Sequence, residues 1–300
     1  MKKMGTKTPG KKVMTAADGQ SENKPRREKT TERRTAGARK TGALMAGRER
    51  LIVGSVSVGL FILVWQLAVT AHAIDPLFVS SPSRIVMTAR DMIGDADFWR
   101  DLTVSAQEYF YGYFAAILIG IPIGLLTGWY RRLQYLLGPL IDMMNAVPRV
   151  TFLPIIVLWF GIGIWSKFAV VFLGAIIPII ISTYAGVRTN EARFLTVARS
   201  FSASQLKIFV SIILPGTVPF IFTGLKYGSG RALLGVVVGE LYAATAGLGH
   251  MIAEAGNTFQ TDVVFFGVLV FTLTGIVITT ILDRIERHFE RWRPRAGGAA

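Results

Sequence analysis

Long apolar runs alternate with short polar segments from residue 51 to residue 282, and this pattern predicts membrane-spanning helices. The first run, residues 51–71, is long enough at about 1.5 Å per residue to cross a hydrocarbon core of about 30 Å. Five further runs of comparable length follow it. The predicted spans are residues 51–71, 103–129, 136–160, 168–187, 218–241 and 263–282. The sequence therefore predicts an all-α, polytopic membrane protein with about six transmembrane helices.

Two of these spans carry residues that predict how they pack. The third contains three prolines, so we expect it to be bent or broken. In the second, small residues recur at every fourth position, which lets a neighbouring helix approach closely. The prolines are Pro139, Pro148 and Pro154, and the small residues are Ala116, Gly120, Gly124 and Gly128.

The segments between the spans differ in charge. Residues 72–102 are acidic on balance, residues 161–167 form a short turn, and residues 242–262 contain neither Lys nor Arg. Basic residues follow the second, fourth and sixth spans, and basic loops remain in the cytoplasm. We therefore expect both termini in the cytoplasm and a periplasmic segment at 72–102. An odd number of spans would leave one basic cluster on the wrong side.

The positive charge of the chain gathers at its N-terminus. The 300 residues are 51% hydrophobic with a net charge of +14, and residues 1–50 hold 15 of the 33 Lys and Arg but only five of the 19 Asp and Glu. Such a segment cannot bury a core, so we predict a disordered basic cytoplasmic tail. It could fix topology, contact anionic lipid or contact nucleic acid. We favour the first and expect no nucleic-acid partner, because a basic flank is usual before a membrane span. A cleaved signal peptide is not expected.

A polar segment, residues 190–215, separates the fourth and fifth spans. We expect a helix over residues 192–201, a turn at residues 202–204, and a second helix that begins at Gln205, with Ser204 as its N-cap, and stops before Pro215. Apolar residues give the segment a broken hydrophobic face. Two interpretations stay open. The segment could be a pair of short helices that docks in a groove of another protein, or it could be an ordinary cytoplasmic loop that lies on the lipid headgroups.

The run TVARSFSASQLKIFVSIILP, residues 196–215, resembles the EAA motif of ABC-transporter permeases. That motif reads Glu-Ala-Ala, three residues, Gly, nine residues, Ile, any residue, Leu and Pro. Ala198, Ile212, Leu214 and Pro215 match it, whereas Thr196 replaces Glu and Ser202 replaces Gly. Residues 101–292 resemble the sulfonate, nitrate and taurine branch of these permeases, in the runs IPIGLLTG, LLGPLIDMM, PIIVLWFGIGIWSK, AGVR, ILPGTVPFIFTGLKYG, GVVVGE and GLGHMI.

The resemblance implies a type I ABC importer permease in the bacterial inner membrane, with a permease core at residues 103–292 and a C-terminal tail at 293–300. Its partners would be two copies of an ABC ATPase, a second permease subunit forming a homodimer, and an extracytoplasmic solute-binding protein. The solute would be a small anion such as a sulfonate, taurine or nitrate, although the branch also includes carriers of thiamine-precursor pyrimidines. The residues that would couple to the ATPase are Thr196, Ala198, Arg199, Ser202, Ala203, Ser204, Ile212, Leu214 and Pro215.

Ionisable residues at membrane depth are costly and are therefore candidates for function. The candidates for a pathway or gate are Arg149, Lys226, Arg231 and Glu240. The structural alternative is that Lys226 extends to the cytoplasmic surface and that Arg149 pairs with a helix end. Glu240 matches the Glu of the GVVVGE run, so the resemblance implies a structural or gating role for it near the outer mouth.

No motif indicates an enzyme or a cofactor site. The chain has no phosphate-binding loop ending in Gly-Lys-Ser/Thr, no Cys, and three scattered His without zinc-ligand spacing. The pair Ser166-Lys167 could suggest a hydrolase, but no third group organises it. A self-contained secondary transporter or channel is the alternative function. It would require internal repeats with paired broken helices, which the sequence does not show.

Overall fold

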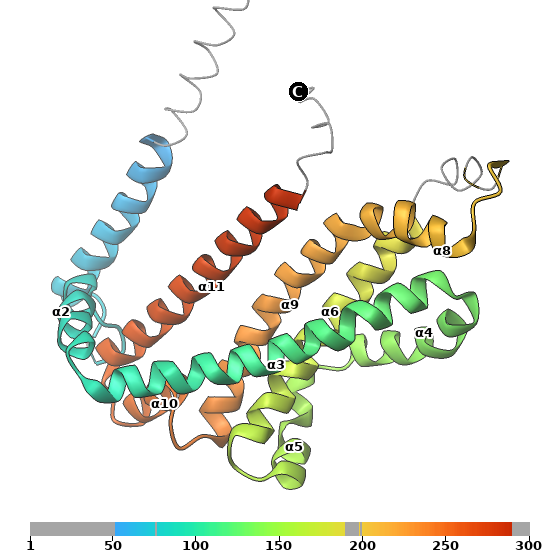
Figure 1. The fold of residues 1–300 in the computed structure, drawn as a ribbon. Helices are drawn as coiled ribbons and strands as arrows, with labels where there is room; N and C mark the ends of the chain where they lie inside the picture. The colour runs from blue at the N-terminus through green and yellow to red at the C-terminus, as the bar shows by residue number, and fades with distance from the viewer. Residues whose placement is uncertain (1–51, 76, 190–197, 199, 290–300) are drawn as a thin grey trace, which may run out of the picture. The chain divides into compact units, whose positions relative to one another are not determined.

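The computed structural model describes residues 52–75, 77–189, 198 and 200–289, and in this part of the chain all regular structure is helical (Figure 1). A helix at Ile52–Thr70 precedes α2 (Pro82–Ile93), α3 (Ala96–Trp129), α4 (Arg131–Ala146), the 3-10 turn η1 (Arg149–Phe152), α5 (Leu153–Phe160), α6 (Ile164–Thr189), α8 (Gln205–Ile208), the π-helix η2 (Phe209–Ile213), α9 (Leu214–Ala243), α10 (Leu248–Asn257) and α11 (Thr261–Phe289). Five helices of the described part of the chain could cross a membrane, or six when the bent pair Arg131–Ala146 and Arg149–Phe160 counts as one span. The prediction of an all-α protein with about six spans is confirmed.

The chain divides into two compact units, residues 1–64 and residues 65–300. In the first unit the described residues, 52–64, form one exposed helix. Helices α2 to α11 all belong to the second unit.

Several spans are longer than the hydropathy pattern predicts. α3 begins at Ala96 because Asp95 caps it, accepting a hydrogen bond from the backbone N–H of Asp97. α6 begins at Ile164, so Lys167 lies in a helix and not in the expected turn at 161–167. The segments at 72–102 and 242–262 also contain helices, α2 and α10.

The small residues of α3 form its contact with α6, as predicted. Gly120 lies against Ile179, Gly124 against Thr183 and Gly128 against Val187. A Cβ atom on Gly124 would lie 2.7 Å from the Thr183 Cβ and 2.8 Å from the carbonyl oxygen of Ile180. Only glycine permits this approach, so the four-residue repeat brings the two helices into parallel contact.

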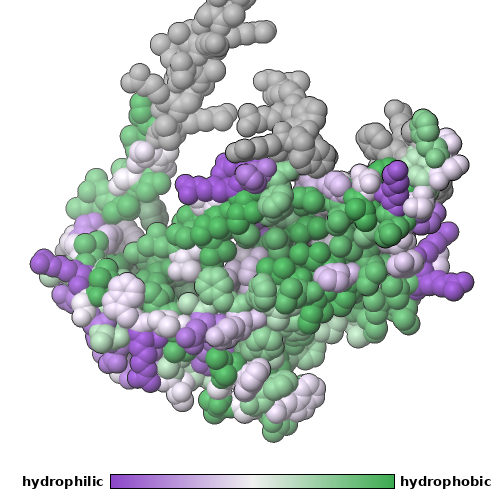
Figure 2. Space-filling model, viewed as in Figure 1, coloured by the Kyte–Doolittle hydropathy of each residue, from purple (hydrophilic) through white to green (hydrophobic). Residues whose placement is uncertain are grey.

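α9 runs antiparallel to α6, while α11 packs against α9 and α10. One end of this bundle therefore holds α8 with the C-termini of α3, α6 and α11, and is called the α8 end. The other, the α10 end, holds α10 with the N-termini of these helices. Figure 2 shows hydrophobic residues over the body of the helices and hydrophilic residues gathered near the ends. Exposed apolar residues such as Leu118 on α3 and Ile276 on α11 fit contact with lipid.

The third span is broken, as its prolines predict. α4 and α5 meet at an angle of 93°. Val147 and Pro148 have extended backbones at the break, and η1 follows. Leu153 and Ile156 of α5 are buried with Val170 of α6. The break therefore places Arg149 beside the middle of the bundle.

The predicted helix end before Pro215 is wrong. α8 passes through the π-helix η2 directly into α9, and Gln205–Ala243 is one candidate span. Pro215 occupies the first turn of α9, where its missing N–H is tolerated. The π-helix η2 lies just before Pro215, and its wider turn leaves room for the pyrrolidine ring beside the residues that precede it.

Candidate functional site

A buried ion pair joins α3 and α6 near the α10 end. The Nζ of Lys167 lies 2.6 Å from Oε1 of Glu108, and the two side chains are only 6% and 1% exposed. Nζ also donates to the carbonyl oxygen of Ala246 at 3.4 Å. Because charges are expensive to bury, this pair is stable only while both members are present.

Glu240 of α9 completes this cluster. Its carboxylate accepts hydrogen bonds from Oγ of Ser105 and from the backbone N–H of Gly249, both at 2.6 Å. The Ser105 hydroxyl in turn accepts from the N–H of Leu248 at 2.9 Å. The Glu108 carboxyl lies beside that of Glu240. We call Glu108, Lys167, Glu240 and Ser105 the buried cluster; it ties α3, α6, α9 and the start of α10 together.

Three of these residues, Glu108, Lys167 and Ser105, are not among the candidates that the sequence pattern indicates. Glu108 was detectable, because it is an isolated carboxylate within an apolar span. Lys167 was hidden by the expected turn, and Ser105 carries no signal of its own. The Ser166 hydroxyl donates to the carbonyl oxygen of Gly163 at 2.9 Å, whereas Lys167 pairs with Glu108, so the two side chains are not organised as a hydrolase pair.

The four predicted pathway residues separate into three places. Lys226 forms ion pairs with Asp283 and Glu286 of α11, toward the α8 end, and the extension of its side chain to the cytoplasmic surface stays a prediction. Glu240 belongs to the buried cluster. Of the four, Arg149 and Arg231 line one cavity, and their role in a pathway stays a prediction.

Arg149 and Arg231 line one cavity of about 310 Å³, which we call the arginine cavity. Its walls come from the break between α4 and α5, from α6 and from α9. Nη2 of Arg149 lies 3.5 Å from Oδ1 of Asn145 at the end of α4, and its Nε is buried without a hydrogen-bond partner. Apart from the two arginines and Asn145, the side chains of the lining are apolar: Val147, Pro148, Val150, Val170, Leu234 and Val238 are examples.

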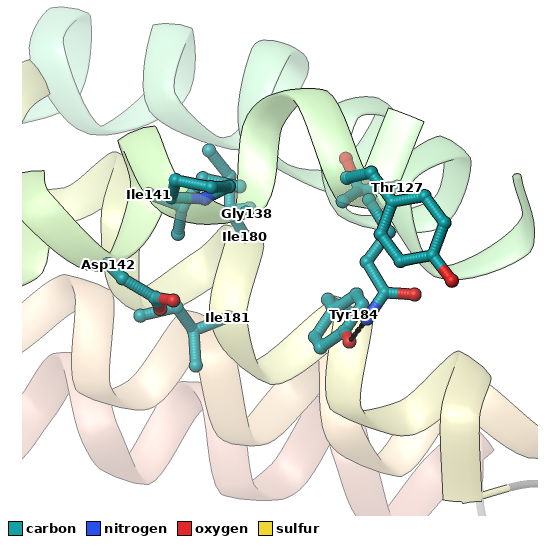
Figure 3. Close-up of a pocket in the computed structure, with 10 residues that line it drawn as sticks. Thr127, Gly138, Ile141, Asp142, Ile180, Ile181 and Tyr184 are labelled. Carbon is teal, nitrogen blue, oxygen red and sulfur yellow. Dashed lines mark hydrogen bonds between the residues drawn. The ribbon is translucent and has the colours of Figure 1, made fainter. Parts of the chain in front are cut away.

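A second cavity, of about 330 Å³, lies between α3, α4 and α6 (Figure 3). Thr127, Asp142 and Tyr184 supply polar atoms from the three helices, and Nε2 of Gln134 donates to the Tyr184 hydroxyl at 2.8 Å. Its charged lining residue among those described is the acidic Asp142. This cavity therefore lacks the cationic character of the arginine cavity.

Ser202 lies in the described part of the polar segment, residues 198 and 200–215. Its φ of 55° lies in the left-handed region, where the EAA motif has glycine, and the N–H of Ala203 donates to the carbonyl oxygen of Ala198 at 3.1 Å. This is the geometry of a helix C-terminus closed by a left-handed residue. Ser204 then caps α8, accepting from the N–H of Lys207 at 3.3 Å, as predicted. Thr196, Arg199 and most of the helix expected at 192–201 lie outside the described residues.

The same segment has one buried and one exposed apolar face. Ile208 and Ile213 are buried with Val187 of α6, and Ala198, Ala203 and Ile212 pack beside them. Leu214 and Pro215 begin α9. Phe201 and Leu206 are 83% and 73% exposed. The segment is thus anchored to the bundle while it presents large apolar side chains outward.

Replacing Ser202 with glycine should raise the free energy of unfolding by about 0.5–1 kcal/mol, because glycine adopts the left-handed conformation without steric cost. The matched change Ser200→Gly, within the preceding helix, should lower it by about 0.5 kcal/mol. Thermal unfolding of the purified variants in detergent measures both. Equal effects of the two changes would contradict this account of Ser202.

The family model "Binding-protein-dependent transport system inner membrane component" matches residues 116–294, more than half of the chain. The chain belongs to this family. The permease is 34% identical over 247 residues to the taurine transport system permease protein TauC of Escherichia coli K12, with 81% of this chain and 89% of TauC covered. It is 30% identical to the putative aliphatic sulfonates transport permease protein SsuC of Bacillus subtilis 168, with 82% and 90% covered.

Solved structures agree with the fold. A chain of the MetNI methionine ABC transporter superposes with a TM-score of 0.58 at 18% identity, covering 64% of this permease and 95% of that chain. The protein is therefore the multi-pass membrane permease of a binding-protein-dependent ABC importer, a transporter and not an enzyme. Such a permease works with an ATPase and a solute-binding protein. This membership rules against the alternative of a self-contained carrier or channel.

Proposed function

We propose that this permease imports a small oxyanion, such as taurine or another organic sulfonate, with nitrate as an inorganic alternative. The supporting observation is its similarity to TauC, at 34% identity over most of both chains. SsuC is named for aliphatic sulfonates, which belong to the same class of solute.

We propose further that the ATPase binds the polar segment, residues 190–215, at the α8 end. Phe201 and Leu206 supply the apolar anchors, because exposed side chains of this size fit a hydrophobic groove. Ile208 and Ile213 transmit the movement of the ATPase to α6 and α9, since they are buried against the bundle. The coupling residues are those of the EAA-like run, Thr196, Ala198, Arg199, Ser202, Ala203, Ser204, Ile212, Leu214 and Pro215.

The proposed assembly is a homodimer of the permease with two ATPase subunits in the bacterial inner membrane. Both termini and the α8 end face the cytoplasm, because the basic residues Arg131, Arg132, Arg188 and Arg284 lie there. The solute-binding protein docks at the α10 end. One face of α9 exposes Tyr227, Arg231 and Leu234 at helical spacing, and this face is available to the second copy or to the pathway between the copies.

Uptake by the complete importer in proteoliposomes tests the proposed solute. We expect ATP-dependent accumulation of taurine and ethanesulfonate when the binding protein is present, with competition between them. A thiamine-precursor pyrimidine should accumulate at least tenfold more slowly. Preferential uptake of the pyrimidine would refute the oxyanion class, and uptake by the permease without its ATPase would refute the proposed coupling.

A further inference from the structure

Two guanidinium groups share the arginine cavity, and none of the described residues that line it is acidic. Among the described residues, neither Arg149 nor Arg231 forms an ion pair, whereas Lys167 and Lys226 both do. Because both side chains line this one cavity, their like charges repel each other. Since unpaired charges at membrane depth are costly, this arrangement requires an explanation.

The fold holds both arginines at this depth. Arg231 lies 12 residues before the end of α9, about 18 Å along the helix and near the middle of a membrane core. Gly174 of α6 allows the close approach, because a Cβ atom there would lie 2.9 Å from the carbonyl oxygen of Arg231. The 93° break after α4 turns Arg149 toward the same cavity.

The two arginines bring hydrogen-bond donors to this cavity. Arg149 has a buried Nε without a partner, and its Nη2 is only 3.5 Å from the Asn145 oxygen. Arg231 has an exposed side chain that lines the same space. A guanidinium group matches a planar or tetrahedral oxyanion through two parallel hydrogen bonds. An anion in the cavity would therefore both satisfy these donors and cancel the repulsion.

We propose that Arg149 and Arg231 together form an oxyanion subsite, which holds the sulfonate oxygens of the solute part-way across the membrane. This inference rests on the proposed function and adds the groups that contact the solute. The apolar walls, with Val170, Leu234 and Val238, accommodate the short carbon chain. A phosphate of an anionic lipid has the same chemistry, so the test must separate the two sources.

The test uses the complete importer, with its ATPase and binding protein, in proteoliposomes of phosphatidylcholine alone. Arg149→Gln and Arg231→Gln should each lower ATP-driven uptake of ethanesulfonate by at least tenfold. ATP hydrolysis stimulated by the loaded binding protein should persist, since the coupling segment is untouched. Arg149→Lys and Arg231→Lys should retain intermediate uptake, because a cation remains. Arg284→Gln, at the end of α11, is the matched control and should transport as wild type.

Three results would overturn the subsite. One is uptake by the Gln variants equal to that of Arg284→Gln. Another is equal impairment of the Lys and Gln variants, which would indicate a structural role. The third is wild-type uptake that requires phosphatidylglycerol while the Gln variants lose only bound lipid in native mass spectrometry. If wild type accumulates no oxyanion at all, the proposed solute class is wrong and the subsite falls with it.

Discussion

Replacing Lys167 with methionine is expected to lower the free energy of unfolding by about 3–5 kcal/mol, the usual cost of breaking a buried ion pair. The change removes the cation that lies 2.6 Å from Glu108 and leaves this carboxylate beside that of Glu240. Both carboxylates are almost inaccessible to water. Thermal or chemical unfolding of the purified permease in detergent measures the loss.

Two further variants show whether the charge is responsible. The double variant Glu108→Gln with Lys167→Met removes both charges of the pair, so it should be more stable than Lys167→Met alone. Lys226→Met is the matched control. This change also takes the cation from two carboxylates, those of Asp283 and Glu286, but the Lys226 side chain is 27% exposed and that of Asp283 is 43% exposed. Water therefore compensates for the lost ion pairs, and the loss of stability should be much smaller than for Lys167→Met. A Lys167→Met protein as stable as Lys226→Met would contradict the importance of the buried cluster.

Phe201→Asp and Leu206→Asp should each weaken binding of the ATPase by at least tenfold and abolish ATP-driven uptake. Burying a large apolar side chain contributes about 1.5–3 kcal/mol, which corresponds to about 10–150-fold in affinity. An aspartate in its place would also have to be desolvated. Both side chains already point away from the bundle, so the folded permease should be little affected. Co-purification of the ATPase and uptake in proteoliposomes measure the effect.

Ile285→Asp supplies the control for these substitutions. Ile285 is an exposed apolar residue near the end of α11, outside the polar segment. Its variant should retain the ATPase. If Phe201→Asp and Leu206→Asp co-purify with the ATPase as well as Ile285→Asp does, the ATPase does not grip this segment, and the proposed coupling must be abandoned.

Local features of the sequence determined the helical framework. Apolar runs of sufficient length predict spans, because lipid leaves backbone groups no partners outside a helix. Pro148 and its neighbouring prolines predicted the broken third span, and the repeat through Gly120, Gly124 and Gly128 predicted a closely packed neighbour. Ser204 was recognisable as a cap, because capping depends on residues within one turn. Each of these properties is set by residues close together in the chain.

Only the tertiary structure decided which distant side chains meet. Glu108 and Lys167 are 59 residues apart, and Ser105 and Glu240 are 135 apart, so no local pattern could join them in one cluster. The same holds for Arg149 and Arg231, which share a cavity only because α4 and α5 break beside α6 and α9. The sequence by itself thus determined where helices form and which residues are costly to bury. The packing of the helices decided whether each charge found a partner within the chain or was left facing an open cavity.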